Sequence, residues 1–135
     1  LSELQSAIPN SITDRIVYII SRDARGQKSL SNSKIYFIVD PNGLIMKYFI
    51  NLVKACVLFL QIQPSVIIST GSGIAVPFIL IGKLLGSKII FIESGARIYT
   101  TSKTGRFMYK YADVFYVQYD TLLKFYPKAI LGSLL

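Results

Sequence analysis

The protein is 135 residues long, with 52% hydrophobic and only 16% charged residues, which excludes a disordered chain and is enough for one domain with its own core. It has no histidine and one cysteine, which excludes zinc sites with the usual ligands, catalytic dyads that use histidine, and an intrachain disulfide. Fifteen lysines and arginines against seven acidic residues give a net charge of +8, which indicates an anionic partner: nucleic acid, a phospholipid surface or a phosphorylated substrate.

Short β-branched runs alternate with longer helical stretches along the chain. Strands are expected, the last of them weak, over Arg15–Ile20, Lys34–Val39, Ser65–Ser69, Lys88–Ile92, Val114–Val117 and Lys128–Leu131. Helices are expected over Leu44–Gln61, Ile74–Leu85, Thr104–Ala112 and Thr121–Phe125. The strands are apolar on both faces, which is typical of a parallel sheet covered by helices. The sequence therefore predicts a single α/β domain over residues 1–135, with a Rossmann-like parallel sheet and helices on both faces.

The helix expected over Leu44–Gln61 is long and mostly apolar. Its polar residues Lys47, Asn51 and Lys54 are spaced three and four apart, so they share one helical face. A buried packing helix is the favoured interpretation, because two lysines near the middle of a membrane span are costly. A helix lying on the bilayer surface and a true span are the alternatives. Cys56 lies in an apolar run of this helix, and we expect it to be buried as a small hydrophobic side chain.

The first candidate site is the turn Gly71-Ser72-Gly73, which follows a strand and opens a helix. Two glycines let the backbone approach a ligand closely, and the helix N-terminus offers free N–H groups to a phosphate oxygen. A dinucleotide fingerprint needs a small residue at position 76, where this chain has Val76, so the turn is weak as a cofactor motif. A tight turn without a ligand is the alternative.

The second candidate is Glu93, at the carboxyl end of an apolar strand, the edge where ligands bind to parallel sheets. A carboxylate in that position is desolvated unless it is paired, and Arg97 either pairs with it or faces a phosphate. A functional carboxylate there orients or deprotonates a sugar hydroxyl. The structural alternative is an ion pair between Glu93 and Arg97 that fixes the loop.

A basic helix face is the third candidate. Lys103, Arg106 and Lys110 fall at helical spacing and alternate with aromatic residues, among them Tyr99, Phe107, Tyr109 and Tyr111. A solvated helix face is the default interpretation. The helix nevertheless starts at the same sheet edge as Glu93, and a basic edge with aromatic residues suits a pyrophosphate or an anionic membrane.

Five segments carry a more specific pattern: Pro64–Gly71, Lys88–Arg97, Ser102–Tyr109, Ala112–Gln118 and Tyr126–Gly132. Together they resemble the acceptor-side, membrane-associated subunit of two-subunit glycosyltransferases. That family includes the eukaryotic subunit of the transferase that adds the second GlcNAc to dolichol-linked oligosaccharide, and bacterial relatives in capsule and exopolysaccharide assembly. The resemblance covers residues 64–132 well and the earlier part only by pattern.

The resemblance implies the N-terminal Rossmann-like half of a GT-B enzyme that is split into two chains. It implies an inverting glycosyltransferase subunit, active only with a partner subunit that carries the UDP-sugar site, and a lipid-linked diphosphate acceptor. No metal or other cofactor is implied. The family opens with a strand and a Gly-Gly-His loop, and both are missing here, since Leu1–Leu4 resembles the helix after that loop.

The resemblance also assigns roles to the candidate residues. Glu93 is the candidate catalytic residue, which orients or activates the acceptor hydroxyl. The acceptor sugar or diphosphate is expected to be held by Gly71, Ser72, Gly73, Ser94, Arg97, Lys103 and Arg106.

The low fraction of charged residues indicates an apolar surface for the partner subunit. We expect this surface at the C-terminal end, formed by Ile130, Leu131, Leu134 and Leu135. The expected location is the cytoplasmic face of the cell membrane, reached through a basic face that salt screens or through an anchor upstream of the chain. A basic Rossmann-like scaffold without chemistry, which binds membrane or nucleic acid, is the alternative; the scattered basic residues argue against nucleic acid.

Overall fold

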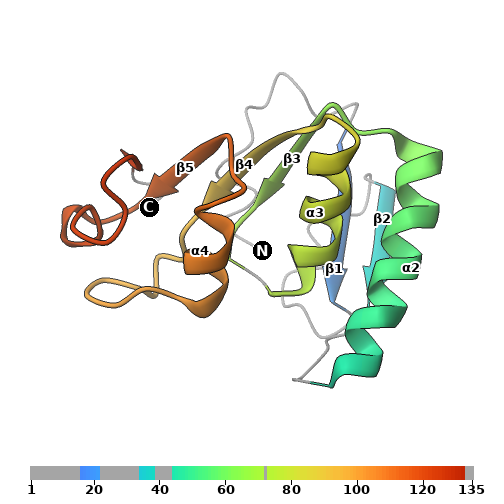
Figure 1. Ribbon diagram of the computed structural model, residues 1–135, viewed down its shortest axis with the longest axis horizontal. Helices are drawn as coiled ribbons and strands as arrows, with labels where there is room; N and C mark the ends of the chain where they lie inside the picture. The colour runs from blue at the N-terminus through green and yellow to red at the C-terminus, as the bar shows by residue number, and fades with distance from the viewer. Residues whose placement is uncertain (1–15, 22–33, 39–43, 72, 133–135) are drawn as a thin grey trace.

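The computed structural model describes residues 16–21, 34–38, 44–71 and 73–132 (Figure 1). Its strands are β1 (Val17–Ser21), β2 (Lys34–Ile38), β3 (Val66–Ser69), β4 (Lys88–Ile92), β5 (Val114–Val117) and β6 (Ile130–Leu131). Its α-helices are α2 (Ile45–Ile62), α3 (Val76–Leu84) and α4 (Lys103–Met108), and its 3-10 turns are η3 (Gly73–Ala75) and η4 (Asp120–Leu122). The expected helix end at Leu1–Leu4 and the candidates Ser72, Leu134 and Leu135 lie outside the described residues.

Every strand pairing among the described residues is parallel, which confirms the predicted α/β fold with a parallel sheet. β1 pairs with β2, and a second sheet has the order β3-β4-β5-β6, so there are two sheets where the pattern predicted one. Ile19 of β1 and Ile67 of β3 pack against the same buried cluster. The two sheets therefore meet through side chains, since no backbone pairing joins them in the described part of the chain.

The main core lies on one face of the four-stranded sheet, between the sheet and the helices α3 and α4. Its buried residues are Ile79, Ile89, Phe91, Met108, Phe115, Val117, Leu122 and Tyr126. Phe91 of β4 and Phe115 of β5 are partners in register, and their rings stack with centroids 5.1 Å apart. This packing fixes the ends of β4 and β5 side by side, and therefore fixes the residues that follow them.

Helix α2 packs with α3 at the outer edge of the molecule (Figure 1). Its buried residues Asn51, Ala55 and Phe59 recur every four positions and so form one face. Of the predicted polar face, only Asn51 packs inward and is completely buried, whereas Lys47 is partly exposed and Lys54 is exposed. The prediction that Cys56 is buried is wrong: Cys56 is exposed, because it lies about 100° around the helix from Ala55 and so outside the buried face.

Three helices differ from the expected ranges. The helix expected over Thr121–Phe125 is instead the 3-10 turn η4, and two others differ at their ends. The helix expected from Ile74 starts with the 3-10 turn η3, and Pro77 then lies in the first turn of α3, where its missing N–H group has no cost. Helix α4 starts at Lys103, because the Ser102 hydroxyl accepts a hydrogen bond from the Gly105 N–H at 2.7 Å. It ends at Met108 rather than Ala112, since the chain turns there to place Asp113 beside Ile89 in β4.

Candidate functional site

The glycine turn after β3 lies against the chain that follows β4. Gly71 has a φ of +85°, which favours glycine, and a Cβ atom there would lie 3.4 Å from both Cβ and N of Ser94. A Cβ atom on Gly73 would lie 3.6 Å from Thr104 Oγ1 and 3.9 Å from the Tyr48 hydroxyl. The structure therefore brings Gly71, Gly73 and Ser94 together, next to the first turn of α4. The backbone at Gly71 requires glycine for its conformation alone, so the tight-turn alternative stays open.

Glu93 directly follows β4, and its side chain is completely buried. Its Oε1 accepts a hydrogen bond from the Ser94 N–H at 3.1 Å. Its Oε2 accepts one from the Ser102 N–H at 3.3 Å and one from the Tyr126 hydroxyl at 2.8 Å. A buried carboxylate is costly unless it is hydrogen-bonded, and these three donors meet that requirement. The carboxylate thus joins three segments: the end of β4, the start of α4 and the chain after β5.

Two side chains around Glu93 are tightly constrained. Burial raises the pKa of the Tyr126 phenol above its ordinary value of 10, and the Glu93 carboxylate raises it further by hydrogen bonding and by charge. Gln118 donates from Nε2 to the Glu93 carbonyl oxygen at 3.1 Å. The Gln118 Oε1 is the one buried side-chain polar atom without a partner among the described residues. Tyr126 is therefore a neutral hydrogen-bond donor to Glu93 in the folded protein at neutral pH.

The ion pair between Glu93 and Arg97, which was the structural alternative for this loop, does not form. The Arg97 side chain is exposed, because a tight turn, with its N–H donating to the Ser94 carbonyl at 2.9 Å, turns the chain outward after β4. Within the described residues the ion pair that does form joins Lys83 and Asp113. Arg97 therefore does not pair with Glu93, and binding of a phosphate by Arg97 stays a prediction.

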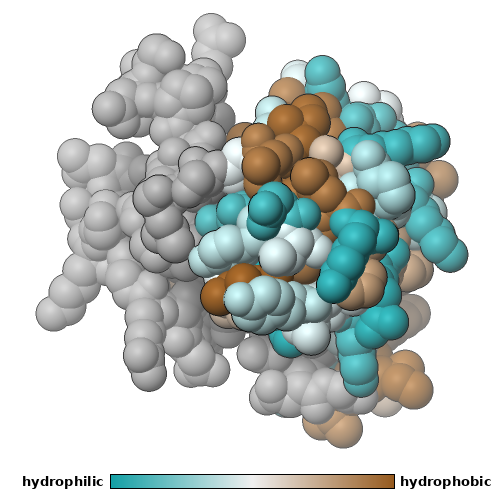
Figure 2. Space-filling view, turned by 90° about the vertical axis from the view of Figure 1, so that its left-hand side faces the viewer, coloured by the Kyte–Doolittle hydropathy of each residue, from teal (hydrophilic) through white to brown (hydrophobic). Residues whose placement is uncertain are grey.

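The basic residues of α4 border an open pocket on the other side of that helix from the glycine turn. The pocket has a volume of about 530 Å³ and is lined by Lys103, Arg106, Phe107, Tyr109, Lys110, Phe125 and Tyr126. Figure 2 shows the end of the molecule where β5 and the chain after it lie, and hydrophilic side chains are mixed there with hydrophobic ones. Tyr126 both lines this pocket and hydrogen-bonds to the buried Glu93. The expected acceptor residues therefore form two groups, on either side of α4.

The residues that hold Glu93 were not identified from the sequence. Ser102 had a usable signal, because serine is a preferred N-cap residue before a helix. Gly105 had another, because a glycine inside a helix is unfavourable and indicates close packing. A Cβ atom on Gly105 would lie 2.8 Å from Glu93 Cδ. Tyr126 had no such signal, since it is 33 residues away from Glu93.

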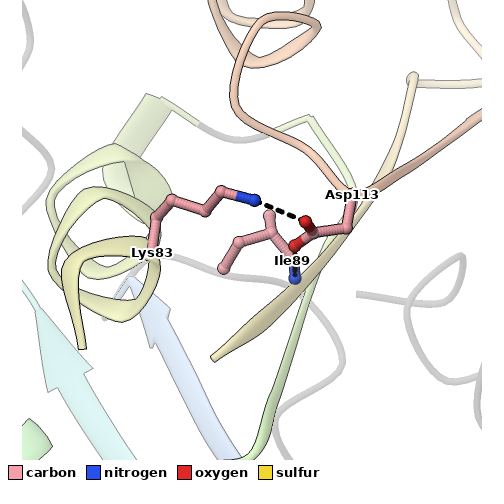
Figure 3. Close-up of polar contacts among 3 residues, drawn as sticks. All are labelled: Lys83, Ile89 and Asp113. Carbon is pink, nitrogen blue, oxygen red and sulfur yellow. Dashed lines mark hydrogen bonds and ion pairs between the residues drawn. The ribbon is translucent and has the colours of Figure 1, made fainter. Parts of the chain in front are cut away.

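At the amino ends of the strands, a polar contact joins β4, the residue before β5 and helix α3 (Figure 3). Asp113, just before β5, forms an ion pair with Lys83 at the end of α3 and accepts a hydrogen bond from the Ile89 N–H at 2.8 Å. The Lys83 hydrogen bond and then the Ile89 N–H hold the pKa of Asp113 below its usual value. Because this contact is at the amino ends of the strands, we interpret it as structural.

The described part of the C-terminal end forms the edge strand β6. Ile130 pairs with Tyr116 and Leu131 with Val117, and both side chains are about half exposed, at 50% and 52%. An exposed apolar edge strand is a suitable contact for another chain. Groups of three or more histidine, cysteine or acidic residues that would hold a metal are absent among the described residues.

Helix α2 is long and apolar enough to cross a membrane, by length and composition alone. Only 17% of its 18 residues are buried in the protein. Some core helices of soluble proteins also meet these criteria of length and composition. These criteria alone therefore do not show whether α2 contacts a membrane.

Comparison with known proteins supports the pattern found in the sequence. The model of the family "Oligosaccharide biosynthesis protein Alg14 like" matches residues 40–135. The UDP-N-acetylglucosamine transferase subunit ALG14 of Mus musculus is 34% identical over 79 residues, which cover 54% of this chain and 36% of the mouse protein. The Kluyveromyces lactis subunit of the same name is 51% identical over 43 residues, which cover 32% of this chain and 18% of that protein. The matched stretch thus spans well under half the length of these relatives.

A solved structure is also similar to this fold. The crystal structure of Acinetobacter baumannii MurG matches with a TM-score of 0.63 and 19% sequence identity, over 78% of this chain and 33% of MurG. This likeness shows the fold, a Rossmann-like α/β unit, and confirms the predicted α/β fold class.

Proposed function

Because the chain belongs to the family of Alg14-like oligosaccharide biosynthesis proteins, we propose that it is the acceptor-side subunit of an inverting glycosyltransferase made of two chains. In this proposal a second chain carries the UDP-sugar site, and GlcNAc or a similar sugar is transferred to a lipid-linked diphosphate. The product serves oligosaccharide or polysaccharide biosynthesis, for example of a capsule or an exopolysaccharide. The reaction takes place at the cytoplasmic face of the membrane.

The basic pocket beside α4 is the observation that carries the acceptor role. Its lining contains Lys103, Arg106 and Lys110, and no acidic residue contributes to the lining. Lysine and arginine are the residues that bind phosphate groups by charge-assisted hydrogen bonds, and arginine does so with two parallel bonds. The pocket opens near the carboxyl ends of the parallel strands, where ligands of α/β proteins bind. A diphosphate is therefore the ligand that its chemistry favours.

In the proposed reaction the acceptor hydroxyl oxygen bonds to C1 of the donor sugar, the bond from C1 to UDP breaks, and the hydroxyl proton passes to a base. Glu93 is the predicted residue for that last step, yet its carboxylate is enclosed by Tyr126 and Ser102. It reaches an acceptor only when these donors move away. The alternative is a positioning role, in which Glu93 holds Tyr126 in the pocket wall and fixes the first turn of α4. The two roles give different results for substitutions of Glu93 and Tyr126.

Binding of the acceptor tests the proposal without a second chain. The probe is a short-chain, water-soluble lipid diphosphate that carries one GlcNAc, titrated into the full chain by calorimetry. Lys103→Gln and Arg106→Gln should each weaken binding about tenfold, because each removes one charge-assisted contact of about 1.5 kcal/mol or more. Lys88→Gln is the matched control, since Lys88 is exposed at the other edge of the sheet. Equal affinities of all four proteins would contradict the acceptor role.

The same titration separates the proposal from the scaffold alternative. A scaffold that binds nucleic acid should bind single-stranded RNA with an affinity that falls steeply as salt rises. An acceptor subunit should prefer the lipid diphosphate to RNA at physiological salt.

A further inference from the structure

The side-chain amide of Gln118 is bonded to the protein at one end only. Gln118 directly follows β5, and its Nε2 donates to the Glu93 carbonyl oxygen at 3.1 Å, just beyond the last paired residues of β4 and β5. Because a carbonyl oxygen only accepts hydrogen bonds, this contact fixes which end of the amide faces Glu93. The other end, Oε1, has no partner in the described part of the chain, although Gln118 is only 9% exposed.

An unpartnered acceptor in a buried position is unfavourable, and buried side-chain polar atoms in folded proteins nearly always have a partner. The Glu93 carboxylate beside Gln118 follows this rule, since three donors bond to it. Gln118 Oε1 departs from it, alone among the buried side-chain polar atoms of the described residues. The atom therefore indicates a hydrogen-bond donor that the described chain does not supply.

The chemistry of that donor follows from the acceptor at Oε1. The oxygens of an ionised diphosphate only accept hydrogen bonds, so a diphosphate cannot be the partner of Oε1. A sugar carries hydroxyl groups, and an N-acetyl sugar also carries an amide N–H, all of which donate. Acceptors and cations are separated in the candidate site: Glu93 and Gln118 lie at the ends of β4 and β5, whereas the lysines and the arginine of the basic pocket lie along α4.

We propose that Gln118 is a specificity-determining residue whose Oε1 accepts a hydrogen bond from an N–H or O–H group of the acceptor sugar. This inference rests on the proposed function for the lipid-linked acceptor, and it adds the direction in which that acceptor binds. The sugar lies at the ends of β4 and β5, and the diphosphate lies along α4. The same direction brings the sugar to Glu93.

The loop between β4 and α4 controls access to Gln118 (Figure 1). One side chain holds both ends of this loop, because the N–H groups of Ser94 and Ser102 donate to the Glu93 carboxylate. Its middle is attached three residues after Gln118, where the Thr121 hydroxyl donates to the Ile98 carbonyl oxygen. Ile98 and Tyr99 are exposed, so little apolar packing holds the loop in place. Movement of the loop away from Thr121 therefore opens the way to Gln118 and Glu93 together.

The test compares two soluble probes by calorimetry on the full chain: a short-chain lipid diphosphate that carries one GlcNAc, and the same diphosphate with a methyl group in place of the sugar. The wild type should bind the sugar probe about tenfold more tightly. Gln118→Met keeps the length of the side chain but lacks the amide, so it should lose this preference and bind the methyl probe as the wild type does. Gln61→Met is the matched control, on an exposed glutamine of α2, and should keep the preference. Lys103→Gln should weaken both probes equally.

Three results would overturn the inference alone. They are equal binding of both probes by the wild type, equal affinity of the wild type and Gln118→Met for the sugar probe, and an equal loss for both probes in Gln118→Met. The second is expected if a buried water is the partner of Oε1, and the third if Gln118 only supports the backbone of Glu93. A wild type that binds neither probe would overturn the proposed function and this inference with it.

A measurement on the wild type replaces the variant if Gln118→Met does not fold. The side-chain amide of Gln118 gives its own proton and nitrogen resonances in an NMR spectrum of the labelled protein. These resonances should shift with the sugar probe and not with the methyl probe. Equal shifts with both probes, or no shift with either, would contradict the hydrogen bond to the sugar.

Discussion

The Tyr126 hydroxyl lies 2.8 Å from Glu93 Oε2, and both side chains are buried. This hydrogen bond joins the end of β4 to a residue 33 positions later in the chain. Ser102 donates to the same carboxylate oxygen from the start of α4. One buried carboxylate thus connects the start of α4 with Tyr126 in the wall of the basic pocket.

Removing the Tyr126 hydroxyl separates the two roles of Glu93. If Glu93 is catalytic, Glu93→Gln should lower transfer by about 10² to 10⁴, far more than it lowers stability, while Tyr126→Phe has a small effect on rate. If Glu93 is a positioning residue, both variants should weaken acceptor binding and lower transfer by similar factors. Steady-state kinetics of the two variants with the second chain present distinguishes these outcomes, and unchanged turnover in Glu93→Gln would exclude both.

At alkaline pH, the buried Tyr126 phenol should contribute less to the unfolding free energy. The folded-state pKa of Tyr126 is raised, so its neutral form stabilises the protein below pH 10, and this contribution is lost as the pH rises above 10. The difference in unfolding free energy between wild type and Tyr126→Phe should therefore shrink above pH 10. Urea denaturation of both proteins across this range measures it. A difference that does not change with pH would show that Tyr126 is not held as a buried donor.

Gly105→Ala should destabilise the protein although alanine favours helices. A Cβ atom there would lie 2.8 Å from both Glu93 Cδ and Ser102 Oγ, and this overpacking costs about 1–3 kcal/mol, more than the gain of about 1 kcal/mol in helix propensity. Gly132→Ala is the control, because its nearest contact would be an ordinary 3.5 Å from Tyr116. Thermal unfolding followed by circular dichroism compares the two. Equal stability would mean that Glu93 moves without cost.

Asp113→Asn should lower the unfolding free energy slightly, and the size of this loss should depend on pH. The folded-state pKa of Asp113 is lowered, so its contribution is present above its unfolded value near 3.8 and is lost as the pH falls through the folded value. The pair with Lys83 is partly exposed, so at neutral pH we expect a loss of about 1 kcal/mol or less. Denaturant titrations at neutral pH and below pH 3.8 check this. An equal difference at both would mean that the charge of Asp113 is not what stabilises the contact.

The edge strand β6 is the predicted contact for the second chain. Deletion of Ile130–Leu135 is predicted to prevent association, but it also removes the backbone pairing of β6 with β5. Leu131→Glu keeps that backbone and should weaken association in a pull-down, while Leu60→Glu in α2 should not. If Leu131→Glu still binds the second chain and Leu60→Glu does not, the partner contact is on α2 and its assignment to β6 is wrong.

The sequence predicted the strands better than the side-chain surroundings. β4 and β5 have the predicted bounds because each is a short apolar, β-branched run with a clear stop. The orientation of α2 was not predictable, because apolar residues surround the helix and the position of Asn51 does not show that it packs inward. The partners of Glu93 were missed for another reason: Tyr126 reaches it only through the parallel order of the strands.

The most direct test of the two-chain account is transfer of radiolabelled GlcNAc from UDP-GlcNAc to a lipid-linked diphosphate. It is measured with this chain, with the second chain, and with both, and calorimetry measures UDP-GlcNAc binding to this chain alone. The account predicts transfer only in the mixture and no tight binding of UDP-GlcNAc by this chain. Turnover by this chain alone, or the same turnover by the second chain alone as by the mixture, would contradict it.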